Sequence, residues 1–119
     1  MINLYGLKNC DSCRKAIKWL EINNFEFNFF DFKDLNLTEI LLSSWIKVHS
    51  LDSLLNKRST TWRNLDEKLK NNFDRDFNEI IIQNTSLIKR PIWEINALPE
   101  SNLGPGFSNI HKEFILEIK

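Results

Sequence analysis

The sequence predicts an α/β fold that opens with a strand, a helix and a strand and closes with a strand, a strand and a helix. Three observations support this class. A short apolar run, residues 2–5, ends shortly before two cysteines and a helical pattern of apolar residues. The middle of the chain also carries helical patterns. Near the end, Pro91 precedes a second apolar run, and turn residues separate that run from a last amphipathic helix.

The opening of the chain predicts two strands joined by a helix. Residues 2–5 form the first predicted strand and residues 6–9 the turn after it. A helix is predicted from Ser12 to a closing asparagine pair at 23–24. Its apolar face consists of Ala16, Trp19, Leu20 and Ile22. Residues 25–32 are rich in aromatics and alternate in part, so they predict a second strand, which a helical crossover makes parallel to the first.

The middle of the chain predicts a helical insertion. Thr38-Glu39 starts one helix, and a second helical piece at 51–55 follows it. Two shorter helices are predicted at 65–73 and 77–83, although the isoleucine run in the latter fits a buried strand equally well.

Residues 56–63 of this insertion predict a polar, cationic loop. Three positive charges, at Lys57, Arg58 and Arg63, lie within seven residues, and Trp62 is a large aromatic among them. Loops of this composition are usually solvated, and this one can also line an anion site. We expect Trp62 to fill the core rather than to cover a site.

The last third of the chain predicts two strands and a helix. Residues 92–95 form the first strand, which Pro91 can only start or edge because it donates no ladder hydrogen bond. A poor second strand is expected at 102–103, among turn residues. Ser108 is a plausible N-cap for the last helix. The predicted buried face of that helix consists of Ile110, Phe114, Ile115 and Ile118.

Length and composition predict one folded domain, residues 1–119, with the helical insertion at about 38–86. Hydrophobic residues make up 42%, with nine Phe and four Trp, which is enough for a packed core. Lys plus Arg and Asp plus Glu both number 16, so no overall charge favours nucleic acid or an anionic membrane as a partner. No apolar run suits a membrane span or a signal peptide, so a cytoplasmic location and a soluble monomer are expected.

The C-x-x-C pair at the start of the first helix predicts redox chemistry. The reactive form of cysteine is the thiolate, which a helix N-terminus stabilises at Cys10. The cations nearby are expected to lower the thiol pKa further; they are Lys8, Arg14, Lys15 and Lys18. Cys13 is one helical turn away, close enough to resolve an intermediate on Cys10 into an internal disulfide.

Two other interpretations of the cysteines are weaker. Zinc needs further ligands, but there is no second cysteine pair, and His49 and His111 lie far apart, where surface roles are expected for them. Inert packing is common for reduced cysteine, but the polar, basic surroundings argue against it. In the cytosol, C-x-x-C is more often catalytic or redox-sensing than structural.

Four segments resemble the arsenate reductase (ArsC) family in its Spx/MgsR/YffB branch, and with it the thioredoxin-like fold. They are Tyr5-Gly6-Leu7-Lys8-Asn9-Cys10, Arg58-Ser59-Thr60-Thr61-Trp62-Arg63, Ile88-Lys89-Arg90-Pro91-Ile92 and Gly106-Phe107-Ser108. They occur in the family's order and span nearly the whole chain. The resemblance therefore implies a β-α-β and β-β-α thioredoxin-like fold with a helical insertion.

The resemblance also implies roles for single residues. In the family's arsenate reductases the cysteine at the Cys10 position attacks arsenate, and arginines that match Arg58 and Arg90 hold the oxyanion. Without the resemblance, both arginines are more simply surface charges. Pro91 matches a proline that is cis in thioredoxin folds and shapes the edge where a thiol substrate pairs. A third family arginine follows the late glycine, where this chain has Phe107, which argues against arsenate as substrate.

The resemblance leaves two classes of function open. Cys13 completes a C-x-x-C like that of the Spx-type regulators, in which the pair is a redox switch on a protein that docks on RNA polymerase. The segments around Thr60 and Gly106 are more similar to the YffB-type proteins, a similarity that implies a glutathione-dependent thiol reductase.

The leading hypothesis is a thiol-disulfide oxidoreductase with Cys10 as nucleophile, Cys13 as resolving thiol, and anions held by Arg58 and Arg90. The candidate substrate-binding residues are Asn9, Ser12, Arg14 and Pro91. No bound cofactor or metal is expected, with glutathione as a candidate co-substrate and glutaredoxin or thioredoxin as candidate partners. The alternatives are a redox-switched regulator that binds the RNA polymerase alpha subunit, without direct nucleic-acid contact, and an arsenate reductase.

Overall fold

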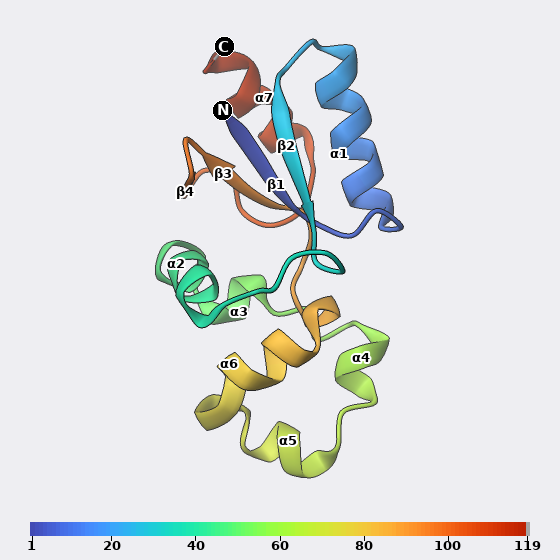
Figure 1. The fold of residues 1–119 in the computed structure, drawn as a ribbon, viewed down its shortest axis with the longest axis vertical. Coiled ribbons are helices and arrows are strands. Elements are labelled where there is room, and N and C mark those ends of the chain that lie inside the picture. Colours follow the sequence, from blue (N-terminus) through green and yellow to red (C-terminus); the bar gives the residue numbers. More distant parts are fainter. Residues whose placement is uncertain (119) are drawn as a thin grey trace. The chain divides into compact units, whose positions relative to one another are not determined.

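The computed structural model describes residues 1–118 and divides into two compact units (Figure 1). The sheet unit contains residues 1–36 and the chain from Arg90 onward. The helical unit contains Leu37–Lys89. The expected organisation as one domain with an insertion stays a prediction beside this division.

The sheet unit is built on four strands in the order β2-β1-β3-β4. They are β1 (Ile2–Gly6), β2 (Phe27–Asp31), β3 (Ile92–Ile95) and β4 (Leu98–Pro99). The predicted parallel pairing of β1 with β2 is confirmed, with Gly6 opposite Asp31 at its end. The third strand runs antiparallel to β1. The α/β class predicted from the sequence is therefore confirmed.

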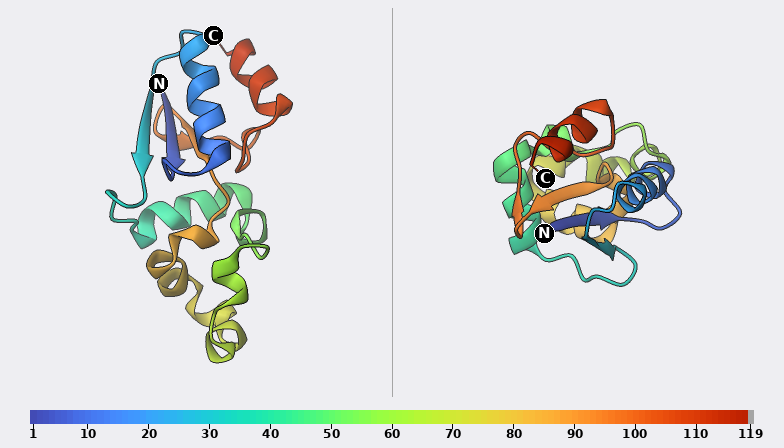
Figure 2. Two further views of the ribbon diagram at one scale, coloured as in Figure 1. Left: turned by 90° about the vertical axis from the view of Figure 1, so that its right-hand side faces the viewer. Right: turned by 90° about the horizontal axis from the view of Figure 1, so that it is seen from above.

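Two helices, α1 (Asp11–Ile22) and α7 (Asn109–Glu117), cover the same face of this sheet (Figure 2). Alternate residues of a strand point to one face, so Ile2 and Leu4 of β1 both face these helices. The buried cluster between sheet and helices consists of Ile2, Leu4, Ala16, Leu20, Trp93, Leu103 and Ile115. This packing fixes the start of α1 against the end of β1, where the cysteines lie.

The position predicted for the fourth strand is wrong. Residues 102–103 form no strand, and Leu103 is instead a fully buried core residue. The strand lies earlier, at Leu98–Pro99, because Asn96 and Ala97 form a tight hairpin turn with φ of 52° and 66°. Such turns need positive φ at both central positions, which usually requires glycine. No glycine marks this turn in the sequence.

The last helix begins after Ser108, as predicted, but its buried face differs from the prediction. Ile110 is 70% exposed and Ile118 is 45% exposed, whereas His111 is buried. The His111 ring holds the helix start: Nδ1 accepts from the backbone N–H of Ser108 at 3.1 Å, and Nε2 donates to the carbonyl of Gly104 at 2.6 Å. The expected surface role of His111 is therefore wrong.

The buried face of the first helix also differs from the prediction. Ile22, assigned to its apolar face, is 67% exposed, and Cys13 is fully buried. The helical period explains this, because Cys13 lies one turn from Ala16 and two turns from Leu20, which are both in the core. Asn23 caps the other end, as expected.

The helical unit contains α2 (Glu39–His49), α3 (Leu51–Leu54), α4 (Thr60–Arg63), α5 (Glu67–Asn71), α6 (Phe73–Gln83) and the 3-10 turn η1 (Thr85–Leu87). Thr38 caps α2 by accepting the N–H of Leu41. The isoleucine run forms part of helix α6 and not of a strand. No helix within residues 1–118 is long and apolar enough to cross a membrane.

The predicted cationic loop is shorter than expected. Its last residues form α4, because the Ser59 hydroxyl accepts the N–H of Trp62 and starts a helical turn. Trp62 is half-buried; its ring meets the edge of Phe73, with the ammonium groups of Lys57 and Lys70 at 5.7 and 5.8 Å from its centre.

Candidate functional site

The two cysteines lie where the sheet unit turns from β1 into α1. Cys10 is the N-cap of the helix, with extended backbone angles, and its carbonyl accepts the N–H of Arg14 at 2.9 Å. Its own N–H donates to the carbonyl of Leu7 at 3.2 Å, which closes the turn. The helix thus starts at Asp11, one residue before the predicted Ser12. Cys10 is half-buried, and its sulfur lies at the end of the helix with unpaired amides.

The surroundings of Cys10 favour its thiolate. Partial burial alone raises the pKa of a thiol, but the backbone amide of Cys13, the Arg90 guanidinium and the Cys13 thiol together lower the pKa of Cys10 below its usual value. The four cations predicted from the sequence to do this, Lys8, Arg14, Lys15 and Lys18, are not among these groups in the described residues. Arg14 instead pairs with Asp11 on the exposed face of the helix.

Cys13 has the opposite environment. It is fully buried, and this burial, together with the negative charge on Cys10, raises the pKa of Cys13 to about 12. Gly6 is the residue that makes room for it: a methyl group at Gly6 would overlap the Cys13 sulfur. Both thiols are reduced in this structure. One helical turn separates the two residues, and their thiols are within hydrogen-bond reach of each other, a geometry from which an internal disulfide can form.

Arg90 and Pro91 directly precede β3 in the sheet unit. The peptide bond between them is cis, as expected from the resemblance of Pro91 to the cis-proline of thioredoxin folds. The carbonyl of Pro91 accepts the N–H of Gly106 at 3.0 Å, and the carbonyl of Gly106 accepts the indole N–H of Trp93 at 2.7 Å. Arg90 thus lies within hydrogen-bond reach of Cys10, and Pro91 is bonded to the loop before α7.

Asp31, which the sequence did not single out, holds the turn that carries the nucleophile. It is buried at the end of β2, opposite Gly6. One carboxylate oxygen accepts the N–H of Lys8 at 3.1 Å, and the other accepts the N–H of Lys33 at 2.8 Å. Burial alone raises the pKa of a carboxyl group, but these amides and the nearby lysine charges lower the pKa of Asp31. An acidic residue that ends an aromatic strand was the only signal in the sequence.

The remaining candidate residues are more loosely placed. Asn9 is exposed in the turn, and Ser12 is half-buried in the first helical turn. Arg58 belongs to the helical unit, where it is exposed beside Lys57 and Lys89 around a hollow of about 590 Å³. Its role toward the cysteines stays a prediction. Among residues 1–118 no three side chains form a potential metal site.

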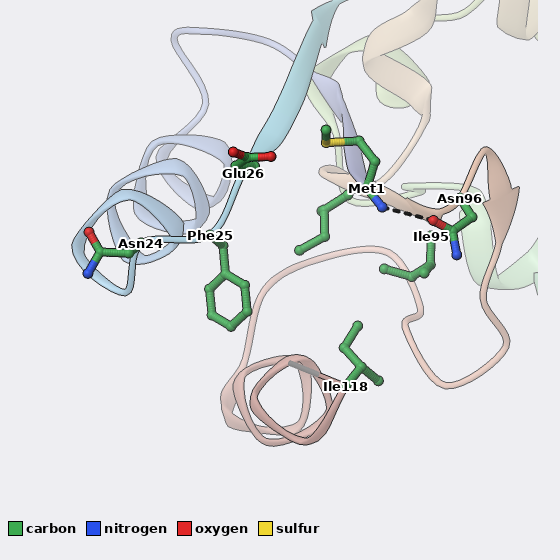
Figure 3. Close-up of a pocket in the computed structure, with 8 residues that line it drawn as sticks. Met1, Asn24, Phe25, Glu26, Ile95, Asn96 and Ile118 are labelled. Atoms are coloured by element: carbon green, nitrogen blue, oxygen red, sulfur yellow. Dashed lines mark hydrogen bonds between the residues drawn. The ribbon is translucent and has the colours of Figure 1, made fainter.

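A different hollow, of about 500 Å³, lies at the other end of the sheet unit (Figure 3). Phe25, Ile95 and Ile118 surround it, next to the hydrogen bond from the Met1 amino group to Asn96. Residues at the start of β1 line it, whereas the cysteines follow the end of that strand. It is therefore separate from the cysteine site.

Comparison with known proteins finds one matching family model and several similar proteins. The family model described as the ArsC family matches residues 5–97. An uncharacterized protein of Haemophilus influenzae is 45% identical over 93 residues, which cover 77% of this chain and 82% of that protein. The global transcriptional regulator Spx 1 of Oceanobacillus iheyensis is 32% identical over 111 residues, which cover 91% of this chain and 81% of the regulator.

Solved structures give the same result. The YffB protein superposes with a TM-score of 0.84 and 30% identity, covering 96% of this chain and 97% of that one. An arsenate reductase (ArsC) related protein from Brucella melitensis gives a TM-score of 0.71 and 32% identity, with 98% and 94% covered. The thioredoxin-like fold and the family predicted by resemblance are confirmed.

Proposed function

We propose that this chain, which belongs to the ArsC family, is a thiol-disulfide oxidoreductase in which Cys10 attacks and Cys13 resolves. The observation that carries the proposal is the contrast between the two thiols. Cys10 is partly accessible and its pKa is lowered beside Arg90, whereas Cys13 is buried with a pKa of about 12. Of the two thiols, Cys10 is therefore the one that loses its proton more readily, which makes Cys10 the nucleophile.

The reaction proceeds in two exchanges. The Cys10 thiolate attacks one sulfur of a substrate disulfide, so a Cys10–substrate bond forms and the other substrate sulfur leaves as a thiolate. Cys13 then loses its proton and attacks the Cys10 sulfur, which forms the internal disulfide and releases the second substrate thiol. Two electrons thereby pass from the pair to the substrate. A thiol donor, glutathione or a protein dithiol, returns them.

The first exchange itself prepares Cys13 to react. Burial is the main cause of its high pKa, and the negative charge on Cys10 is a further cause. That charge disappears when Cys10 forms the mixed disulfide, so the pKa of Cys13 falls at the moment when its thiolate is needed. The cytoplasm, where a thiol pool can reduce the pair again, is the setting that we propose.

Serine variants of the two cysteines test this function. Exchange with glutathione disulfide and with a peptide disulfide is followed for the wild type, Cys10→Ser and Cys13→Ser. We expect Cys10→Ser to fall to the uncatalysed rate, and Cys13→Ser to accumulate a mixed disulfide on Cys10 that mass spectrometry locates. Wild-type exchange no faster than the background would refute the proposal, as would full activity of Cys10→Ser.

A regulatory function is the second candidate, because the Spx 1 regulator of Oceanobacillus iheyensis is similar over most of this chain. In this case the same cysteine pair switches binding to the RNA polymerase alpha subunit. Binding of the purified subunit to the reduced protein, the oxidised protein and Cys13→Ser measures it. A dissociation constant that differs between the two redox forms supports a switch, and equal or undetectable binding in both excludes it.

Arsenate reduction is the third candidate. The position after Gly106 holds Phe107, whose ring packs against Trp93 at 6.1 Å between ring centres. An aromatic ring cannot hold an oxyanion as a guanidinium does. Arsenate turnover with glutathione and glutaredoxin is therefore expected to be absent, and its appearance would restore this candidate.

A further inference from the structure

A hollow of about 260 Å³ lies between the two helices of the sheet unit, and we call it the α1–α7 groove. It is lined by Lys15, Lys18, Trp19, Ile22, Phe107 and Lys112. Its wall is aromatic: the rings of Trp19 and Phe107 are 6.0 Å apart, and Trp93 packs behind Phe107. The groove thus offers an apolar surface with three ammonium groups around it.

The residues that line the groove carry three positive charges and no negative charge. In the described part of the chain, none of the three lysines takes part in an ion pair. No carboxylate lines the groove; of the two acids on α1, Asp11 is paired with Arg14, and Glu21 is not among the residues that line the groove. Lys112 places its ammonium 5.4 Å from the centre of the Phe107 ring. The chain as a whole is neutral, so this concentration of charge is local.

The groove lies close to the redox pair. Lys15 and Lys18 follow Cys10 by five and eight residues, which is about 8 and 12 Å along the helix axis. Phe107 follows Gly106, whose N–H is bonded to the carbonyl of Pro91 at 3.0 Å. A chain segment that lies in the groove is therefore within a few residues of the Cys10 sulfur.

We propose that the α1–α7 groove binds an acidic segment of the protein whose disulfide is reduced, with carboxylates on the lysines and an apolar side chain against Trp19 and Phe107. This inference rests on the proposed function and names its substrate as an acidic protein. The groove has room for one or two side chains, and the balanced charge of the whole chain does not favour a nucleic acid. Paired charges of this kind mainly raise the association rate and so lower KM.

Two peptides that carry the same disulfide and the same leucine, one flanked by glutamates and one by lysines, test the preference. The proteins are the wild type, the groove variant Lys15→Glu with Lys18→Glu, and a control of equal net charge, Lys47→Glu with Lys68→Glu. The control lysines are exposed and lie in the helical unit. Hydroxyethyl disulfide, which is small and uncharged, reports the redox chemistry alone.

We expect the wild type and the control to have a kcat/KM about tenfold higher for the acidic peptide than for the basic one, mostly because KM is lower. This preference should decrease at high salt, which screens the charges. The groove variant should lose this preference and keep its rate on hydroxyethyl disulfide. An equal rate on both peptides in the wild type, with hydroxyethyl disulfide still reduced, overturns the groove while leaving the proposed function intact.

A binding measurement tests the groove even if the protein has no redox activity. A fluorescent acidic peptide that lacks cysteine is titrated with Cys10→Ser, in the presence and absence of the groove substitutions. Tighter binding to the intact groove supports docking of an acidic segment there, and the exchange assays decide separately whether the proposed function holds. Binding that is unaffected by the groove substitutions, or tighter binding of a short single-stranded DNA than of the peptide, overturns it.

Discussion

Cys10 and Cys13 are separated by only two residues, yet their thiols lie in different surroundings. The first caps a helix beside a guanidinium, and the second lies in the core under Gly6. Local position decides this difference more than overall charge does, because the nearby lysines contribute little while one arginine, more than 70 residues away in the sequence, contributes directly. The chemistry of the pair therefore depends on a few single side chains.

Arg90 is predicted to set the reactivity of Cys10. Replacement by leucine, Arg90→Leu, removes a hydrogen bond and a positive charge that favour the thiolate, so the pKa of Cys10 rises. The pH dependence of alkylation at Cys10, followed by mass spectrometry, should move to higher pH. Arg14→Leu is the matched control, since Arg14 pairs with Asp11, and it should leave the profile in place. Equal profiles in all three proteins would contradict this role.

Asp31 is predicted to hold the turn before Cys10. Asp31→Asn keeps the shape of the side chain but offers one acceptor in place of two, so one of the amides of Lys8 and Lys33 loses its partner. A hydrogen bond to a charged group contributes about 1.5–3 kcal/mol, and we expect a loss of about 2 kcal/mol in the free energy of unfolding, measured in urea. Asp34→Asn, exposed in the same turn, should change it by less than about 0.5 kcal/mol.

The same carboxylate makes a pH prediction. Its pKa is lowered in the folded state from a usual value of 3.8, so its contribution is fully present above that value and is lost as the pH falls through the folded pKa. The free energy of unfolding should fall more steeply below pH 3.8 in the wild type than in Asp31→Asn. Parallel curves for the two proteins would show that Asp31 has no such role.

The junction of β1 and α1 is built around the contact between Gly6 and Cys13. Gly6→Ala places a methyl group against the Cys13 sulfur, which should lower the free energy of unfolding by about 1–3 kcal/mol. Removing the sulfur should relieve the overlap, so Gly6→Ala is expected to be less harmful in a Cys13→Ala background. Gly104→Ala, at a glycine with open space around it, is the control. A loss of the same size in both backgrounds would contradict this contact.

The sequence predicted the elements whose signals are local. Apolar periodicity located α1, and the caps Thr38 and Ser108 located the starts of α2 and α7. It misplaced β4, since the turn at Asn96 and Ala97 lacks the expected glycine. Tertiary packing, and not local pattern, decides such cases.

The site was predictable to a similar degree. A cysteine pair at a helix start is a strong local signal, and the resemblance added Arg90. Asp31 and His111 were missed because each acts by hydrogen bonds to backbone groups of other segments, Lys8 for the first and Gly104 for the second. Partners of that kind leave no trace in residue spacing.

The chain as a whole combines the sheet unit with the helical unit. The sheet unit contains both cysteines, Arg90, Pro91 and the α1–α7 groove, and the helical unit contains Arg58 and its neighbouring lysines. Relatives of this chain include regulators and proteins related to arsenate reductase. A cysteine pair that cycles between dithiol and disulfide is compatible with a reductase and with a switch, and its existence is the premise of both.

A redox titration tests that premise. The purified wild type is equilibrated with glutathione buffers from about −270 to −200 mV, and free thiols are then alkylated and counted by mass spectrometry. We predict one two-electron transition within this range, with a Cys10–Cys13 disulfide on the oxidised side and Cys10 alkylated first on the reduced side. A protein that keeps both thiols free throughout, or that carries only glutathione on Cys10 and never the internal disulfide, would contradict it.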